Sequence, residues 1–323
     1  MSGLAKADCS VQHDAADEQT GVRGEEMRVL NIGSLNTDKT YKVKHFVQPK
    51  ETLKALHYAE FCGGKGLNQS VALAKASAQV WHAGAVGQDG EELLKVLKEA
   101  GVHTELIQKV DGPSGHAIIQ VDQTGQNCIL ICGGANDDIS KEQIDAALNG
   151  FGAGDLLLLQ NEISNIAYAM ERAKEAGMQI AFNPSPINAA IREYPLALVD
   201  YFLVNEIEGK MLAGIDSEDP LLIKDALLTR YPQAAFVLTL GEAGAYFFNG
   251  QKTVFQPVYT VNAIDTTAAG DTFCGYFIAG LCEGLPVEAR LKYASAASAI
   301  AVSRMGASPS IPDQAEVAAF LKK

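Results

Sequence analysis

The sequence has no apolar run long enough to cross a membrane, no excess of positive charge and no paired cysteine motif. A membrane-spanning helix needs roughly 18 mainly apolar residues in succession, whereas the longest apolar runs here have the length of buried elements. Acidic residues number 39 against 26 basic ones, which gives a formal net charge of −13. This balance argues against a general binder of nucleic acid or of anionic membranes. We therefore expect no nucleic-acid partner and no membrane partner.

The cysteines do not form a recognisable framework either. Six are scattered along the chain without a CxxC pair, and the six histidines show no zinc-binding spacing. Neither a disulfide scaffold nor a structural zinc site is expected. A reducing cytoplasm is the natural compartment for such a chain.

Two familiar nucleotide-binding motifs are also missing. No GxxxxGK[ST] pattern occurs, and no GxGxxG follows a predicted strand. The first absence excludes a P-loop enzyme, and the second argues against a hydride-transfer enzyme with a dinucleotide cofactor. A site for phosphate groups remains open, because backbone amides and a metal ion can supply positive potential locally.

The chain has ample material for a large core, since 47% of its 323 residues are apolar. Residues 1–26 differ from the rest, because they are rich in acidic side chains, lack aromatic residues and contain no apolar segment typical of a signal peptide. We expect residues 1–26 to be an acidic, disordered extension. A single folded domain is expected over residues 27–323.

Beyond residue 28, patterns typical of strands and helices alternate. Strands are predicted at 28–33, 79–86, 155–160, 179–184, 200–205 and 235–240, and helices at about 66–77, 90–100, 140–149, 164–176, 220–230, 269–282, 286–304 and 313–322. This alternation predicts an α/β fold with a mostly parallel sheet covered by helices on both faces. Residues 39–62 and 113–132 indicate strand pairs without helices between them, which predicts a small separate sheet.

The most informative motif is Asp265-Thr266-Thr267-Ala268-Ala269-Gly270-Asp271-Thr272-Phe273, where small residues precede an acid and an apolar helix. The start of a helix presents unpaired N–H groups and a positive dipole end, which suits a phosphate. An aspartate beside a bound phosphoryl group can orient a hydroxyl and accept its proton. The alternative is that Asp271 is an ordinary helix cap, and on this segment alone the cap is favoured.

Two further motifs have the residue types of a sugar site. The loop Cys62-Gly63-Gly64-Lys65-Gly66-Leu67-Asn68-Gln69 permits close backbone contacts through its glycines, and its asparagine can hydrogen-bond a polyol. A flexible strand-to-helix turn explains this loop equally well. Asn36 and Asp38 follow the first strand, where ligands collect in α/β sheets. They can grip adjacent sugar hydroxyls, although Asx turns use the same residues.

Other polar residues also fall at the carboxyl ends of predicted strands. Asn205 and Glu208 have the spacing of a capping box, or of a phosphate contact followed by a magnesium partner. Glu162 and Thr239 end or follow two more strands. Because the carboxyl ends of parallel strands share one edge of a sheet, these residues converge on one cleft. That convergence favours an enzyme over a structural protein.

Together the motifs resemble those of the ribokinase-like sugar kinases. The blocks Gly63-Gly64-Lys65-Gly66-x-Asn68, Asn205-x-x-Glu208 and Asp265-Thr266-x-Ala268-Ala269-Gly270-Asp271 have the order and spacing of that family. The resemblance covers about residues 28–322 and implies a Rossmann-like domain with a small β-sheet lid, here 39–62 and 113–132. In the family the lid closes over the sugar and often forms a homodimer interface. The implied activity is transfer of the γ-phosphoryl group of ATP to the 5-hydroxyl of D-ribose.

The resemblance also implies a role for each matching residue. Sugar contacts would come from Asn36, Asp38, Gly64, Lys65, Asn68, Glu162, Asp271 and, in the lid, Ala117, Ile119 and Ile129. The catalytic base would be Asp271, beside an anion hole made by Ala268, Ala269 and Gly270. Nucleotide contacts would be Asn205, Thr239, Gly241, Gly244, Gly270 and Ser295. From the outer shell Glu208 would help to organise Mg²⁺, and a K⁺ ion would lie near Asp265, Thr267, Ala301, Arg304, Gly306 and Ser310.

Three residues depart from the family pattern. Lys50 stands before Glu51-Thr52 in the first lid strand, where the family usually has glycine, and Leu67 replaces a customary alanine in the sugar loop. Cys62 stands where the family often has glycine or an aromatic neighbour. We expect the bulkier Leu67 to tighten or reshape the sugar pocket. The alternatives are a kinase for another small sugar, such as 2-deoxyribose or fructose, or for a nucleoside. A non-catalytic sugar-binding or regulatory protein is the alternative of another class.

Overall fold

The computed structural model describes residues 27–322, so the expectation for residues 1–26 concerns residues outside this range. Within it, the larger sheet consists of β1 (Val29–Ile32), β4 (Val80–Val86), β5 (His103–Lys109), β8 (Leu156–Gln160), β9 (Gln179–Asn183), β10 (Tyr201–Asn205), β11 (Ala235–Thr239), β12 (Gly244–Phe248) and β13 (Thr253–Pro257). Their order is β5-β4-β1-β8-β9-β10-β11-β12-β13. Neighbouring strands run parallel from β5 to β11. At the other end, β12 is antiparallel to β11, and β13 is antiparallel to β12. The predicted mostly parallel sheet is therefore confirmed.

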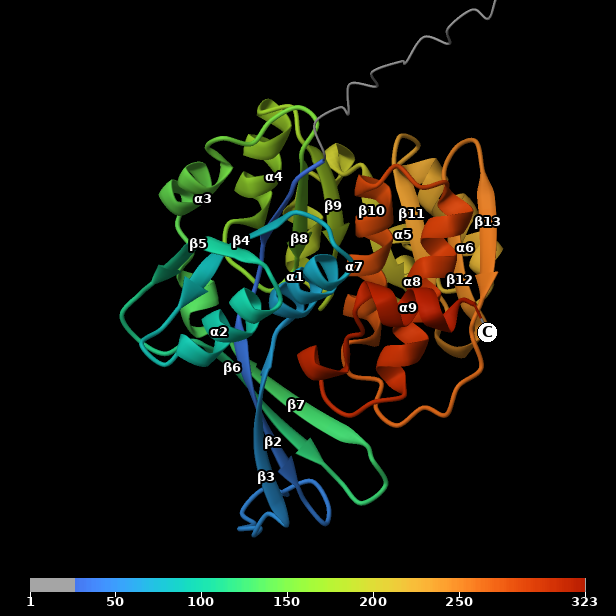
Figure 1. Cartoon of the computed structure of the whole chain (residues 1–323). Helices are drawn as coiled ribbons and strands as arrows, with labels where there is room; N and C mark the ends of the chain where they lie inside the picture. The colour runs from blue at the N-terminus through green and yellow to red at the C-terminus, as the bar shows by residue number, and fades with distance from the viewer. Residues whose placement is uncertain (1–26, 323) are drawn as a thin grey trace, which may run out of the picture.

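Helices cover both faces of this sheet (Figure 1). They are α1 (Lys65–Lys75), α2 (Glu91–Glu99), α3 (Lys141–Leu148), α4 (Ile166–Glu175), α5 (Glu206–Ala213), α6 (Pro220–Arg230), α7 (Ala269–Cys282), α8 (Val287–Val302) and α9 (Gln314–Phe320). Side chains of β8 alternate between two cores: Leu156 and Leu158 pack with α1, α2, α7, α8 and α9, whereas Leu157 and Leu159 pack with α3 to α6. None of the helices in residues 27–322 is long and apolar enough to cross a membrane.

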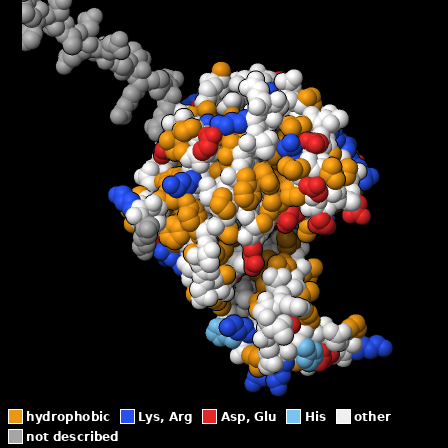
Figure 2. Space-filling view, turned by 90° about the vertical axis from the view of Figure 1, so that its right-hand side faces the viewer, with side chains coloured by type: hydrophobic (Ala, Val, Ile, Leu, Met, Phe, Trp, Pro, Cys, Tyr) orange, Lys and Arg blue, Asp and Glu red, His pale blue; other side chains and the backbone are white. Residues whose placement is uncertain are grey.

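A second sheet, which we call the small sheet, comprises β2 (Asn36–Lys42), β3 (His57–Gly63), β6 (Gly115–Val121) and β7 (Asn127–Cys132), in the order β3-β2-β6-β7. It projects from the body as an arm, and basic side chains gather towards its free end (Figure 2). β2 starts at Asn36, immediately after the connection from β1, so the predicted sugar ligands Asn36 and Asp38 lie within a strand of this sheet.

The register of the small sheet places several predicted residues on one face. Asp38 is paired with Ala117, and Ile119 is paired with Ile129. Ala117 and Ile119 are two positions apart in β6, so their side chains point the same way. The face that carries Asp38 therefore also carries Ala117, Ile119 and Ile129.

Lys50 does not lie in a strand, contrary to the expectation, because β2 ends at residue 42 and β3 begins at residue 57. Its φ of 72° is in the left-handed region, which glycine adopts at no steric cost. Replacing Lys50 with glycine should raise the free energy of unfolding by roughly 0.5–1 kcal/mol. Chemical denaturation would measure this, with Lys54→Gly as the control in the same loop at a residue without positive φ. Equal effects of the two substitutions would contradict the prediction.

Candidate active site

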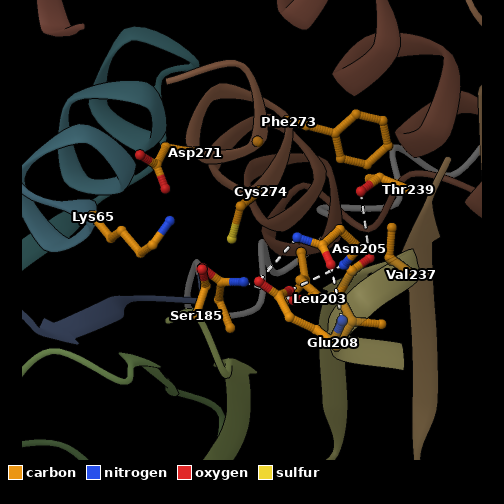
Figure 3. A pocket seen from close by; sticks show the side chains of 13 residues that line it. Lys65, Ser185, Leu203, Asn205, Glu208, Val237, Thr239, Asp271, Phe273 and Cys274 are labelled. Atoms are coloured by element: carbon orange, nitrogen blue, oxygen red, sulfur yellow. Dashed lines mark hydrogen bonds between the residues drawn. The ribbon is translucent and has the colours of Figure 1, made fainter. Parts of the chain in front are cut away.

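The strand order creates a crevice beside β1. From β1 the chain adds β4 and β5 on one side, and then β8, β9, β10 and β11 on the other. In α/β sheets, ligands bind at the carboxyl ends of the strands where the strand order reverses in this way. A pocket lies at this edge (Figure 3), lined by Lys65, Asn183, Ser185, Leu203, Val204, Asn205, Glu208, Val237, Thr239, Gly270, Asp271, Phe273 and Cys274. Six residues proposed from the sequence meet in it: Lys65, Asn205, Glu208, Thr239, Gly270 and Asp271.

Asp271 is a buried carboxylate held by side chains of another helix. It lies in the first turn of α7 and is 7% exposed. The Asn68 amide donates to one of its oxygens at 3.0 Å, and the Gln69 amide donates to the other at 2.9 Å. The residue at the cap position is Ala268, and no side-chain cap bond is formed there. The helix-cap interpretation of Asp271 is therefore wrong.

The start of α7 is open towards the pocket at Gly270. A Cβ atom built on Gly270 would have no heavy atom within 4 Å. The Gly270 and Asp271 N–H groups fall in the first helical turn, where the helix supplies no acceptor carbonyl. The N–H of Ala269, in contrast, donates to the Thr266 carbonyl at 3.2 Å. Of the proposed anion-hole residues, Gly270 is the one that lines the pocket.

Asn68 has a polar atom that fits a ligand. Its amide nitrogen is bonded to Asp271, but its Oδ1 is buried and has no hydrogen-bond partner among the described residues. A buried acceptor without a donor is costly. A hydroxyl of a bound sugar would supply the missing donor, so this observation fits a polyol beside Asp271.

Glu162 and Lys65 share the space next to Asp271. Glu162 accepts hydrogen bonds from the backbone N–H of Lys65 at 3.0 Å and from the Ser34 hydroxyl. Burial raises the pKa of Glu162. Burial alone would lower the pKa of the Lys65 ammonium, but Asp271, Glu162 and Glu208 outweigh it and the pKa is raised. Lys65 is therefore a stable positive charge among acids.

Asp38 reaches towards this acidic cluster from the small sheet. Burial, then the charges of Glu162 and Asp271, raise the pKa of Asp38 to about 7. Gly63 is what makes room for this side chain, because a Cβ atom on Gly63 would lie 2.0 Å from Asp38 Oδ2. Next to it, Asn36 is buried, and its Oδ1 accepts a hydrogen bond from Asn136 at 2.8 Å.

Asn205 and Glu208 form the capping box of α5. The Asn205 side chain accepts from the Glu208 N–H at 2.9 Å, and both Glu208 carboxylate oxygens accept from Asn205 at 3.0 Å (Figure 3). The capping interpretation is confirmed, and both residues also line the pocket. Within residues 27–322, no three His, Cys, Asp or Glu side chains are grouped to hold a metal ion. The magnesium role of Glu208 stays a prediction.

The residues proposed around K⁺ come from the loop before α7, the last turn of α8 and the segment that follows α8, and Asp265 joins the first to the last. Its carboxylate accepts from the Gly306 N–H at 2.9 Å and from the Thr267 N–H at 2.9 Å. Arg304 has its guanidinium paired with Glu316 of α9, so only its backbone is offered to an ion. The other two residues proposed for the K⁺ site, Ala301 and Ser310, are fully buried.

Several other proposed residues do not line the pocket. Absent from its walls are Gly241, Gly244 and Ser295, the sugar residues Gly64, Asn68 and Glu162, the anion-hole residues Ala268 and Ala269, and all proposed residues of the small sheet. Gly244 is required by the sheet itself, because its φ is 130° and a Cβ there would lie 2.2 Å from the Gln256 carbonyl oxygen. Leu67 is 0% exposed and packs in the core with α7 and α8. Leu67 is therefore not a wall of the pocket, although its core includes the pocket residues Phe273 and Cys274, and the expectation that it reshapes the sugar pocket stays a prediction.

Three polar residues of this site, Gln69, Asn183 and Ser185, were not predicted from the sequence. Gln69 follows Asn68 in α1 and donates a hydrogen bond to Asp271, but only Asn68 belongs to the family motif. Asn183 ends β9 and lines the pocket. The strand-end rule that indicated Asn205 and Thr239 applies equally to Asn183 and would have found it.

Comparison with known proteins places this geometry in context. A model of the pfkB family carbohydrate kinases matches residues 27–314. Ribokinase from Haemophilus influenzae is 33% identical over 298 residues, covering 90% of this chain and 97% of that protein. Deoxyribokinase from Salmonella typhi is 33% identical, covering 88% and 96%. The structure of Arabidopsis thaliana ribokinase complexed with ribose and ATP is 29% identical, with a TM-score of 0.83 and coverage of 92% and 99%.

Proposed function

The chain belongs to the pfkB family of carbohydrate kinases, and from this we propose that it is a ribokinase, which transfers the γ-phosphoryl group of ATP to the 5-hydroxyl of D-ribose. It is thus a phosphotransferase with an alcohol group as acceptor. The observation that carries the proposal is the buried Asp271 carboxylate, fixed by two amides at the open start of α7. The ribose and ATP in the Arabidopsis structure support the choice of substrates.

Asp271 accepts the proton of the attacking hydroxyl in this mechanism. The 5-oxygen forms a bond to the γ-phosphorus, the bond from that phosphorus to the β,γ-bridging oxygen breaks, and ADP leaves. The sugar is held by the orphan Oδ1 of Asn68 and by the Asp38 carboxylate, with Glu162 as a further acceptor. These contacts aim one hydroxyl at the phosphoryl group, which removes much of the entropic part of the barrier.

Positive charge at the transferring phosphoryl group comes from the start of α7 and from Lys65. Gly270 lines the pocket in the first turn of α7, so the positive end of the helix dipole lies at the pocket. The nucleotide would lie against Asn205 and Thr239, at the ends of β10 and β11. When bound, Mg²⁺ would neutralise phosphate charge, with Glu208 as an outer-shell partner of its waters.

One comparison also favours an alternative sugar. Deoxyribokinase from Salmonella typhi has the same identity to this chain as the Haemophilus ribokinase, so 2-deoxyribose is the second candidate. The deciding experiment is sugar-dependent ADP release from Mg-ATP, compared for ribose, 2-deoxyribose, fructose and adenosine. Turnover with ribose and little with the others would support the proposal. A higher kcat/KM for any other substrate would overturn the choice of ribose, and sugar binding without ADP release would favour the non-catalytic alternative.

We expect a monovalent cation to stimulate this reaction. The loops around Asp265 and Gly306 are joined next to the start of α7, so an ion bound there would order the residues that face the phosphoryl group. At equal ionic strength, K⁺ should give a several-fold higher kcat than Na⁺. Identical rates in the two salts would contradict the assignment of Asp265, Thr267, Ala301, Arg304, Gly306 and Ser310 to a K⁺ site.

We also propose a homodimer formed through the small sheet, in the cytoplasm. β7 is an edge strand of that sheet, and Ile129, Leu130 and Ile131 are 50%, 66% and 48% exposed. Exposed apolar side chains on an edge strand favour pairing with another chain. Analytical ultracentrifugation should give a dimer that Leu130→Lys dissociates, with Leu221→Lys on α6 as an exposed control. A monomeric wild-type protein at micromolar concentration would contradict this arrangement.

A further inference from the structure

A chain of buried amide side chains leads from the backbone carbonyl of Gly66, in the first turn of α1, to the carboxylate of Asp271. Its members Asn31, Gln160 and Gln69 are 0%, 1% and 1% exposed. We propose that this chain fixes the direction of the Gln69 amide, so that its N–H groups always face Asp271, and that Gln69 is thereby a positioning residue for the base. The inference rests on the proposed function, because it assigns Gln69 a role in that reaction.

The direction of the chain is set at one end by the Gly66 carbonyl. A carbonyl oxygen only accepts hydrogen bonds, so the Asn31 group that lies 2.8 Å from it must be the NH₂. Asn31 Oδ1 therefore faces Gln160, whose NH₂ donates to it at 3.0 Å. The same NH₂ donates to Gln69 Oε1 at 2.7 Å. With its oxygen thus occupied, Gln69 must present its NH₂ to Asp271, at 2.9 Å.

A second carbonyl imposes the same direction from the opposite side. The Asn183 NH₂ donates to the Leu203 carbonyl at 2.8 Å, so Asn183 Oδ1 is turned towards Gln69. The Gln69 NH₂ donates to that oxygen at 3.1 Å. Both hydrogens of the Gln69 amide are therefore used, one on Asn183 and one on Asp271. A flipped Gln69 would place its oxygen against two acceptors and lose all three bonds.

This arrangement matters because Asp271 must be ionised and correctly aimed to accept a proton. A carboxylate is favoured when donors face its oxygens, and a fixed acceptor opposite it would favour the protonated acid instead. Asn68 also donates to Asp271, but its Oδ1 has no partner among the described residues, so no protein group other than Asp271 itself fixes the direction of that amide. Gln69 is the donor whose direction the protein sets in advance.

The same network provides a matched structural control at Ser70. Its hydroxyl accepts from Asn31 at 2.8 Å and is bonded to His82 at 2.8 Å. Burial lowers the pKa of His82 to about 4, so that ring is neutral at working pH. Removing the Ser70 hydroxyl breaks buried hydrogen bonds, but Asn31 stays fixed by Gly66. Ser70→Ala should therefore cost stability without changing the direction of Gln69.

The test compares Gln69→Met, Gln160→Met and Ser70→Ala. The carboxyl of Asp271 is followed by NMR in protein carrying ¹³C-labelled aspartate, and its signal is assigned by its loss in Asp271→Asn. The titratable groups facing Asp271, namely Lys65, Cys274, Glu162 and Asp38, are unchanged in all three variants. In Gln69→Met the titration midpoint should move to higher pH by about one unit, since a hydrogen bond to a charged group is lost. Gln160→Met should give a smaller move in the same direction, and Ser70→Ala none.

Kinetics supply the second measurement. With ribose and Mg-ATP, Gln69→Met should lower kcat about tenfold, leave the KM for ATP unchanged and move the acid limb of the pH profile of kcat, which reports the substrate-bound enzyme, to higher pH. An unmoved Asp271 titration in folded Gln69→Met would overturn the inference, as would an equal move in Ser70→Ala. If Gln69→Met does not fold, Gln160→Met decides. A wild-type protein without turnover would defeat the proposed function, whereas the NMR titration would still decide the role of Gln69.

Discussion

Replacing Asp271 with asparagine should lower kcat by about 10²–10⁴-fold, the usual contribution of a general base, while the protein stays folded. Asparagine has nearly the same shape but cannot accept the hydroxyl proton. One oxygen remains to accept from Asn68 or Gln69, so the start of α7 should keep its structure. Calorimetry should show sugar binding within a few-fold of the wild type, and ADP release should report the loss of turnover.

Asp313→Asn is the control for this prediction. Asp313 is a true helix cap, because its carboxylate accepts from the Glu316 N–H at 2.9 Å at the start of α9. It lies outside the pocket, so its substitution should change stability slightly and leave kcat intact. An Asp271→Asn variant that turns over at the parent rate would show that another group removes the proton.

Asp38→Asn should raise the KM for ribose by about 10²-fold with a smaller change in kcat, because two charge-assisted hydrogen bonds to sugar hydroxyls are each worth roughly 1.5–3 kcal/mol. The wild type should also lose kcat/KM for sugar as the pH falls below about 7, since burial and then Glu162 and Asp271 raise the pKa of Asp38 to about 7. This acid limb should change in the variant. A wild-type profile that stays flat from about pH 8 to about pH 6 would contradict the role of Asp38.

The raised pKa of Asp38 also makes the stability of the fold depend on pH. The folded state holds a proton on Asp38 up to about pH 7, whereas an unfolded aspartate releases it near 3.8. Stability therefore falls as the pH rises between these values, and Asp38→Asn should be more stable than the wild type at about pH 8. Hydrogen bonds with Ser114 outweigh burial and lower the pKa of Asp89, so Asp89→Asn should be less stable there. Thermal melts at about pH 8 and pH 4 would check both signs.

The sequence predicted six of the seven parallel strands, because they are buried and mainly apolar. It did not indicate the seventh, β5, or the antiparallel strands β12 and β13. β5 is a largely polar edge strand, so its pattern is weak. β12 and β13 were detectable in principle, since Asn249-Gly250 between two apolar segments is a strong hairpin signal.

At the site, residues were predictable where topology alone places them. Asn205 and Thr239 end neighbouring parallel strands, and such ends share an edge in any sheet of this kind. The contact between Gln69 and Asp271 joins residues 202 positions apart, and no local pattern in either segment encodes it. The burial of Leu67 was unpredictable for the same reason, because α1 packs on α7 through the side of the helix that carries it.

Only Cys62 of the small sheet packs against either hydrophobic core, yet the sheet supplies Asp38. The free energy of ribose binding would then include the cost of bringing this arm against the body, and the apparent affinity would scale with the fraction of molecules already in that arrangement. Substitutions in the connections that tether the arm, far from any hydroxyl, should change the KM for every sugar by a common factor. The ratio of the KM values for different sugars would stay the same. Overall sugar affinity and the preference for one sugar can therefore evolve through different parts of the chain.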